Sequence, residues 1–354
     1  MAQLVDILYL LSGIYSLILI IIGTPANLLC FYIFSRLMPN RDNSTIIMFS
    51  YMSIIEVIIP FTWNMNYVIR EILWRFLSPE SFRNHRNLEQ TSIIVCKTIS
   101  YFAYFSLQCA AWLRTVATFT RCVSLHHQCK LRGKLNRAET AKRLSLTIII
   151  FILFINIPVF VINGKRYPLN NNSSTNTNGT SEVKCYSSKF FSIYEIVHLM
   201  LYNFLPFMIM IICNIFIIRK VRESNNRLSF SKRRRASKRS SNQERLTKTL
   251  IFVTILFILF TTPSALFYIL VRHKINYRNL VTMSLSNLAT TTHVLSFLIY
   301  SVTSTDFREA LVGIIQRKNS VIRLSSERRS MIDVPESDIK QRTPSKSLKK
   351  TEEL

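Results

Sequence analysis

Charged side chains interrupt two long runs of otherwise apolar residues: Glu56 and Arg114 lie well inside such runs, and Arg121 ends one. An ionised side chain in apolar surroundings is costly unless an opposite charge or a polar partner compensates it. Arg114 precedes Arg121 by seven positions, so on a helix the two lie about 10.5 Å apart along one face. Glu56 is the one acid that lies well inside such a run. The chemistry that these residues offer is ion pairing within the protein.

Motifs of enzymatic chemistry do not occur in the sequence. A metalloprotease HExxH, a Gly-rich phosphate-binding loop and a Gly-x-Ser-x-Gly turn are all missing. His126 and His127 form a pair without a second group of metal ligands, and a histidine pair in a basic loop is usually solvated. We therefore expect no enzyme, no bound metal and no cofactor.

The residues that must position these charges form seven apolar runs of roughly 20 residues or more. A run of that length crosses a ~30 Å hydrocarbon core as a helix, because backbone groups in lipid must be satisfied within the segment. We therefore expect an all-α membrane protein, a seven-transmembrane helix bundle. Residues 1–7 contain no Lys or Arg and the first run is too long for a signal peptide, so we expect it to be the first span. The runs cover residues 8–34, 45–69, 93–121, 144–163, 193–218, 249–271 and 279–303.

Basic residues are unevenly divided between the segments that connect these runs. Lys and Arg number 31 on one side and 12 on the other, and the richer side faces the cytoplasm by the positive-inside rule. We therefore predict a multi-pass plasma-membrane protein with an extracellular N-terminus and a cytoplasmic C-terminus. This segregation accounts for the formal charge of +26 without a nucleic-acid partner. The richer segments are 36–44, 125–143, 219–248 and 304–354.

Sequons and cysteines agree with this orientation. Asn171, Asn172 and Asn178 are glycosylation acceptors in a polar loop that is predicted to face outward. Cys96 and Cys185 are the two cysteines placed on the oxidising side, so one disulfide between them is the economical pairing. The alternative is two free thiols outside the cell.

Several motifs resemble those of the rhodopsin-like G-protein-coupled receptors, over about residues 14 to 316. Helix one carries Asn27 in "GTPANLL", helix five Pro206 in "NFLPFMIMIICN", and helix six Pro263 in "LFTTPSALF". Helix seven ends in "SFLIYSVTSTDFREAL". This sequence is similar to the family's Asn-Pro-x-x-Tyr motif followed by a short amphipathic eighth helix.

The resemblance gives Arg121 a role. Its spacing from Cys96 matches the family's helix three, where the arginine of an Asp-Arg-Tyr motif faces the site at which a heterotrimeric G protein docks. "HHQCK" is similar to the loop that follows in the family, which places Leu125 and Gln128 in the same coupling region. The alternative is an arginine that only anchors the helix end. We also expect a helix-bundle switch, in which Arg114 stands where the family usually has an apolar residue. Its residues are Asn27, Glu56, Arg114, Pro206, Pro263, Ser296 and Tyr300.

Some motifs depart from the family pattern. Thr120 stands in place of the acid before the arginine, Glu56 in place of the helix-two aspartate, and Ser296-Phe297 in place of Asn-Pro. Without an acid at position 120, Arg121 lacks its usual partner, so both raised basal activity and a decayed receptor with weak signalling are open. "WLRTVATFTR" and "FLIY" are similar to invertebrate neuropeptide receptors of the FMRFamide-receptor type.

The ligand class is inferred partly by exclusion. Ala103 stands where amine receptors carry an aspartate, and Thr290 stands where opsins carry the retinal-binding lysine, so a peptide ligand is favoured. Glu195, an acid near the outer end of helix five, is a candidate acceptor for a basic ligand group. Taken singly, an aromatic residue in a membrane helix more often packs against its neighbours than binds a ligand. The resemblance places these residues around the outer cavity: Tyr104, Leu107, Gln108, Glu195, His198, Tyr202, Tyr268 and Ser286.

Arg114 lies near mid-membrane, where an unpaired guanidinium costs at least roughly 2.5–3.5 kcal/mol, so we expect it to have a partner. In the family, the position of Glu56 faces helices three and seven, in a region that related receptors use to bind sodium. We predict that an Arg114–Glu56 ion pair replaces that ion, either directly or through water or the Ser296 hydroxyl. The alternative is that Arg114 extends into the cytoplasmic cavity and never meets Glu56.

The basic segment 229–241 is expected to be a disordered cytoplasmic loop facing anionic membrane lipid. Ser237 follows Arg234-Arg235-Ala236, which fits basic-directed kinases, and arrestin is a further expected partner. The expected organisation is an extracellular segment 1–7, a receptor domain 8–316 and a disordered tail 317–354. A seven-span transporter or channel is the competing function, although no internal repeat supports it.

Overall fold

The computed structural model describes residues 2–38, 43–77, 87–125, 132–168, 181–230, 237–270 and 277–316. The chain divides into two compact units, Met1–Arg308 and Glu309–Leu354. Every site described below lies in the first unit. The division does not bear on the expected boundaries at residues 7 and 316, which stay predictions.

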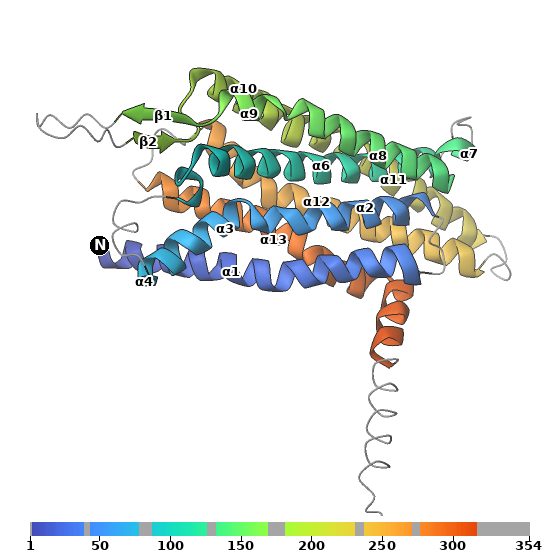
Figure 1. Cartoon of the computed structure of the whole chain (residues 1–354). Coiled ribbons are helices and arrows are strands. Elements are labelled where there is room, and N and C mark those ends of the chain that lie inside the picture. The colour runs from blue at the N-terminus through green and yellow to red at the C-terminus, as the bar shows by residue number, and fades with distance from the viewer. Residues whose placement is uncertain are drawn as a thin grey trace, which may run out of the picture. The chain divides into compact units, whose positions relative to one another are not determined.

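Among the described residues, the helices of the first unit group into seven segments, and Figure 1 shows helices running side by side. They confirm the predicted all-α bundle. The segments are α1 (Ala2–Tyr32), the interrupted α2, α3 and α4 (Ser44–Ile58, Trp63–Val68 and Arg75–Leu77), α6 (Ile93–Leu125), α8 and α9 (Ala138–Ile155 and Pro158–Ile162), α10 and α11 (Lys189–Leu199 and Leu205–Phe230), α12 (Ser237–Leu270) and α13 (Arg278–Thr303).

Shorter elements connect these segments. α7 (Arg132–Leu135) precedes α8, and β1 (Lys165–Pro168) pairs antiparallel with β2 (Ser181–Lys184). Within the bundle, α12 packs along α13, α2 along α6, and α1 against both α2 and α13. α6 therefore lies inside the bundle, and most of its side chains are buried.

Among the described residues, six segments are long and apolar enough to cross a membrane, and α13 is the segment that falls short. Its polarity has a structural reason. Asn287, Thr290, Thr292 and His293 are all buried inside the bundle. Hydropathy counts every residue alike, whereas lipid contacts only the outer face of a helix. Because α13 packs between α1 and α12, it completes the bundle as the seventh span.

Prolines interrupt the helices near the disulfide. Pro60 lies in a 3₁₀ turn at Ile59–Phe61, and Thr62 Oγ1 donates to Ile59 O over 2.6 Å before α3 begins. Pro206 follows a π-helical turn at Met200–Phe204, because proline lacks the N–H that the preceding turn needs. These irregular turns let short stretches of helix present polar side chains to the interior.

The helices extend beyond the apolar runs at one end of the bundle. α11 continues to Phe230 and α12 begins at Ser237, so the expectation of disorder over 229–241 is wrong at both ends of that segment. Lys, Arg, Glu and Gln are good helix formers, and a helix need not end where apolarity ends. Residues 231–236 lie outside the described part of the chain. Residues 305–316 are helical, as predicted for the short eighth helix.

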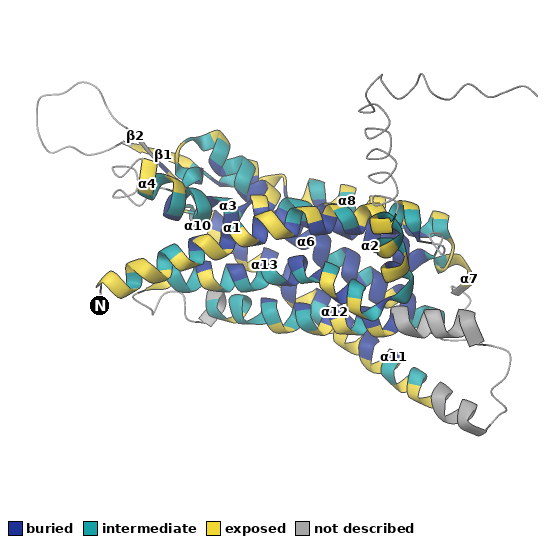
Figure 2. Cartoon of the chain, turned by 90° about the horizontal axis from the view of Figure 1, so that it is seen from below, coloured by how far each residue is buried: buried dark blue, intermediate teal, exposed yellow. Residues whose placement is uncertain are grey.

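Buried residues gather between the helices, and exposed apolar residues lie on outward faces, as Figure 2 shows. Large apolar side chains such as Ile21, Phe151 and Ile193 are more than half exposed. Outer faces of this kind fit helices whose surroundings are lipid rather than water. The bundle is accordingly that of a multi-pass membrane protein.

Candidate functional site

A disulfide links Cys96, at the start of α6, to Cys185, which follows β2, and confirms the predicted pairing. The two Cα atoms lie 6.1 Å apart although 89 residues separate them along the chain. The bond holds the segment after β2 against the end of the bundle where α6 begins. We call this end the disulfide end, and the opposite end of α6, which carries Arg121, the Arg121 end.

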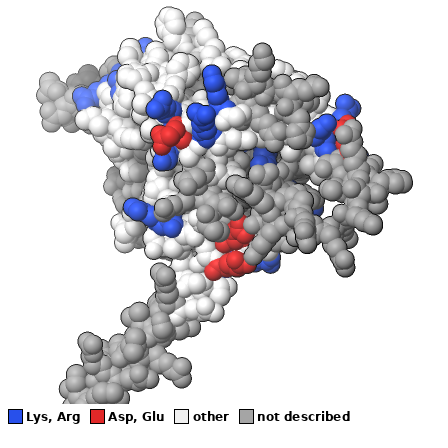
Figure 3. Space-filling view, turned by 90° about the vertical axis from the view of Figure 1, so that its right-hand side faces the viewer, with Lys and Arg blue, Asp and Glu red and all other residues white. Residues whose placement is uncertain are grey.

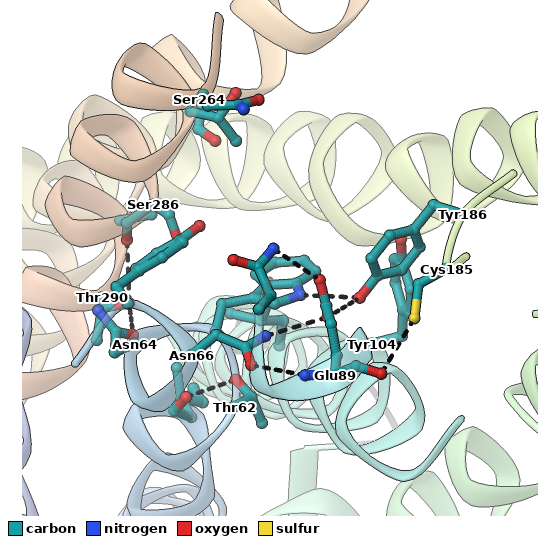
Figure 4. Close-up of a pocket in the computed structure, with 18 of the residues that line it drawn as sticks. Thr62, Asn64, Asn66, Glu89, Tyr104, Cys185, Tyr186, Ser264, Ser286 and Thr290 are labelled. Atoms are coloured by element: carbon teal, nitrogen blue, oxygen red, sulfur yellow. Dashed lines mark hydrogen bonds between the residues drawn. The ribbon is translucent and has the colours of Figure 1, made fainter. Parts of the chain in front are cut away.

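A cavity of about 760 Å³ lies at the disulfide end, and Figure 4 shows part of its wall. Residues of α1, α3, α6, α10, α12 and α13 line it, together with the segment around Cys185. The wall mixes aromatic and polar side chains, which is the composition of pockets that bind small ligands. Six of the residues assigned to a cavity from the sequence line this one: Tyr104, Leu107, Glu195, His198, Tyr202 and Ser286.

Two other residues assigned to the cavity do not appear on its described wall. Gln108 lies against α8 instead, where its Oε1 accepts a hydrogen bond of 2.8 Å from Asn156 Nδ2. Tyr268 belongs to α12, but its side chain lies outside the described part of the structure.

Tyr104 connects the wall residues of α6 and α10. Its hydroxyl donates to Glu195 Oε1 over 3.4 Å, and its carbonyl oxygen lies 3.3 Å from His198 Nε2. The His198 ring lies edge-on to Tyr104, with centroids 4.5 Å apart, and stacks on Tyr202 at 5.6 Å. The two helices therefore present one continuous aromatic wall.

Glu89, Asn66 and Tyr186 also line the cavity, and none of the three was predicted from the sequence. Asn66 Nδ2 and Tyr186 Oη donate to Glu89 Oε2 over 3.1 and 2.8 Å, as Figure 4 shows. Burial raises the pKa of the Glu89 carboxyl, while hydrogen bonds from Tyr186 and Asn66 lower it in part. Burial also raises the pKa of Tyr186 well above its usual value, so the phenol stays protonated and donates.

A second charged group lies on the same wall. Glu71 accepts from two arginines, Arg70 through Nε at 2.5 Å and Arg75 through a terminal nitrogen at 3.3 Å. Arg70 also donates to Asn87 Oδ1 over 3.0 Å. The Glu71 carboxylate is thus compensated by cations within the protein.

The charged residues of the mid-bundle form a buried triad. Arg114 donates to Glu56 Oε1 over 2.7 Å, so the predicted ion pair forms directly, without a bridging group. His293 on α13 adds a third member, with Nδ1 only 2.9 Å from the same oxygen. The Phe257 ring covers the guanidinium at 4.2 Å, and all three triad side chains are inaccessible to solvent. Only His293 was not foreseen.

The expected bridge through Ser296 is absent, because its hydroxyl donates to Thr292 O in its own helix. Other predicted switch residues surround the triad. Tyr300 is buried and packs against Phe34 and Phe49. Among the described residues, several buried atoms here have no protein hydrogen-bond partner: Glu56 Oε2, Arg114 Nε, His293 Nε2, Tyr300 Oη and both amide atoms of Asn27.

Arg121 is 5 % exposed at its end of α6 and donates through Nε to Thr247 Oγ1 on α12 over 2.8 Å. Thr120 does not take the place of the missing acid, because its hydroxyl donates to Ala117 O. Leu125 is half-buried at the end of α6. Figure 3 views this end, where basic side chains lie around the described helix ends.

Several predicted modification and coupling residues cannot be placed. Gln128 and the sequons at Asn171, Asn172 and Asn178 lie outside the described residues. Ser237 is the first residue of α12, but its side chain is not described.

A family model for the 7 transmembrane receptor (rhodopsin family) matches residues 76–306, which is more than half of the chain. The matched range contains the disulfide, Arg114, Arg121 and His293, while Glu56 lies before it. No curated protein matches the chain.

Proposed function

This chain belongs to the rhodopsin family of 7-transmembrane receptors, and we propose that it binds an extracellular peptide at the disulfide end and activates a heterotrimeric G protein at the Arg121 end. The observation that carries the proposal is the position of both sites on one helix. α6 lines the cavity with Tyr104 and carries the buried Arg121 near its other end. A change in the packing of this helix reaches both sites.

The cavity supports a ligand of several functional groups. Its volume of about 760 Å³ lies within the range of known ligand pockets. Ala103 has no carboxylate to pair with an amine ligand, and Thr290 has no amine to bind retinal covalently. The Thr290 hydroxyl instead donates to Asn64 Oδ1 over 2.9 Å. A wall of aromatic side chains with acidic groups at separate positions suits a peptide better than it suits a monoamine or retinal. A neuropeptide is the specific class that we propose.

Signalling is proposed to be a shift between two populated conformations. A ligand that binds one conformation more tightly raises the population of that conformation. The size of the shift is set by the difference between the ligand's affinities for the two conformations. Pro263 lies inside α12 between the cavity residues Thr261 and Ser264, and Thr247 on the same helix accepts a hydrogen bond from Arg121. A bend of α12 at Pro263 would release Arg121 for contact with the G protein, with Leu125 and Gln128 in the same contact region.

The proposed orientation puts the disulfide end outside the cell. An oxidising environment suits the Cys96–Cys185 bond, and the positive-inside rule puts the basic Arg121 end in the cytoplasm. In this orientation Asn171, Asn172 and Asn178 are accessible to glycosylation, and Ser237 is accessible to basic-directed kinases. Arrestin would then bind at the same cytoplasmic end.

The test is a peptide-library screen on cells that express the full chain, with calcium and cyclic-nucleotide readouts. Tyr104→Ala should weaken the response by raising the peptide concentration needed for it. Arg121→Ala should abolish the response while peptide binding persists. Peptide binding without any response in the unmodified chain would favour a decayed receptor, and transport of solute without nucleotide exchange would contradict the proposal.

A further inference from the structure

Glu89 is an acid of the cavity wall that lacks a cationic partner within the described protein. It lies in a 3₁₀ turn, Leu88–Gln90, and is 6 % exposed. Its carboxylate accepts only from neutral donors, which are Asn66 Nδ2, Tyr186 Oη and, over 3.4 Å, Asn87 Nδ2. A buried carboxylate usually gains a cation or loses its charge, because hydrogen bonds from neutral groups replace hydration only in part.

Among the described residues, two arginines of the same wall are engaged by other partners. Arg70 and Arg75 both contact Glu71, and Arg70 also donates to Asn87. Their positive charge is therefore directed to a different carboxylate of the same wall. The raised pKa of Glu89 agrees with this, because burial outweighs both the hydrogen bonds and the smaller attraction of Arg70 that favour its charged form.

Tyr186 is held rigidly in the position from which it donates to Glu89. Its φ of 60° lies in the left-handed region, which a bulky residue adopts only where surrounding contacts enforce it. Asn163 Oδ1 accepts from the Tyr186 backbone N–H over 2.8 Å, and Ser100 Oγ donates to its hydroxyl over 2.8 Å. The disulfide at the preceding residue adds a covalent constraint.

The carboxylate also has aromatic neighbours. Tyr186 accepts from Trp63 Nε1 over 3.4 Å, and Trp63 lies edge-on to Tyr104 with ring centroids 5.8 Å apart. Trp63, Tyr104 and Tyr186 all line the same cavity as Glu89. A cation bound there would meet a carboxylate and aromatic faces together, both of which attract positive charge.

We infer that Glu89 anchors a cationic group of the ligand, an ammonium or a guanidinium, and that Tyr186 is the positioning residue that orients its carboxylate. The inference rests on the proposed function in one respect: the cavity must be the ligand site. It assigns the cation to Glu89 rather than to Glu195, whose carboxylate accepts from Tyr104 on the other side of the wall.

Two matched probes test the inference on the full chain in detergent micelles. N-acetyl-phenylalanyl-arginine amide carries a guanidinium as its one charge, and N-acetyl-phenylalanyl-citrulline amide replaces it by a neutral urea of nearly the same shape. Unmodified chain should bind the arginine probe about tenfold more tightly, the effect of one hydrogen bond to a charged group. The shift of the thermal unfolding midpoint with probe concentration gives both affinities.

Variants then assign the charge. Glu89→Gln should bring the ratio of the two affinities to about one, and Tyr186→Phe should reduce the ratio while the chain still folds. Glu195→Gln is the matched control and should leave the ratio unchanged. An affinity ratio near one in the unmodified chain, or a ratio that survives Glu89→Gln and is lost in Glu195→Gln, would overturn the inference.

A measurement on the unmodified chain covers the case in which Glu89→Gln does not fold. A carbodiimide couples the amine of phenylalanyl-lysine amide to a nearby carboxylate and takes up the water that is released. Mass mapping should find the new amide at Glu89; coupling at Glu195 or Asp6 instead would contradict the inference. Nucleotide exchange on a G protein is measured separately, so binding at Glu89 without exchange would refute only the proposed signalling.

Discussion

Replacing Glu56 by glutamine removes the negative charge of the buried triad while keeping the shape of the side chain. In the unmodified chain this carboxylate accepts from Arg114 at 2.7 Å and lies 2.9 Å from His293 Nδ1. Glu56→Gln leaves the Arg114 guanidinium buried without a counter-charge. Breaking a buried ion pair in this way costs about 3–5 kcal/mol of unfolding free energy.

The reverse substitution, Arg114→Leu, should cost less. His293 stays within hydrogen-bond distance of Glu56, so the carboxylate keeps one polar contact. The double variant removes both charges, so its loss should be well below the sum of the two single losses. Glu223→Gln is the matched control, because it breaks the exposed Lys220–Glu223 pair of 3.1 Å and should cost less than about 1 kcal/mol.

Denaturant unfolding of each variant in detergent micelles, followed by tryptophan fluorescence, gives these free energies. Surface expression in cells should follow the same order. Equal losses in the two single variants would show that His293 does not compensate for Arg114. Additive losses in the double variant would refute the ion pair itself.

Thr247→Ala removes the hydroxyl that accepts from Arg121 Nε at 2.8 Å. Ligand-free nucleotide exchange should therefore rise by up to about tenfold. Unchanged exchange would show that this contact does not restrain the resting state. Thr120→Asp should lower ligand-free exchange, because an acid there gives Arg121 a partner on its own helix. Replacing both cysteines of the disulfide by serine should cost about 2–4 kcal/mol in denaturant unfolding, and an unchanged midpoint would contradict this. Because burial raises the pKa of Glu89, its carboxylate gains a proton at a higher pH than an ordinary glutamate, and its attraction for a cation is lost as the pH falls. Affinity for N-acetyl-phenylalanyl-arginine amide should therefore begin to fall at a higher pH than the titration of an ordinary glutamate would give, while affinity for the citrulline probe stays constant.

The Arg114–Glu56 pair was predictable because a charge in an apolar run has few ways to be compensated. Only one acid lay well inside the spans, so the partner was nearly determined by elimination. His293 gave no such constraint, since a histidine among the threonines and serines of a polar helix has many ordinary explanations. The seven-helix bundle was predictable for a related reason, because backbone groups in lipid leave few alternatives.

The cavity was predictable mainly for residues carried by the long helical segments. Tyr104 and His198 lie on helix faces whose positions follow from helical spacing. Glu89 and Tyr186 come from connecting segments, and their positions depend on a disulfide, a left-handed backbone conformation and side-chain hydrogen bonds. None of these leaves a periodic pattern. Gln108 differs for another reason, since its contact with α8 depends on how two helices are rotated against each other.

The buried polar face of α13 bears on how the chain is inserted into the membrane. Insertion machinery weighs each emerging segment by its hydrophobicity, and α13 falls below the level that the six other spans reach among the described residues. Some of its polar groups have hydrogen-bond partners on helices made much earlier. Ser16 and Asn64 each donate to Asn287 over 2.7 Å, and Glu56 lies 2.9 Å from His293. The stability of the last helix in the membrane therefore depends on its docking against polar groups of the first two spans, which are already in place.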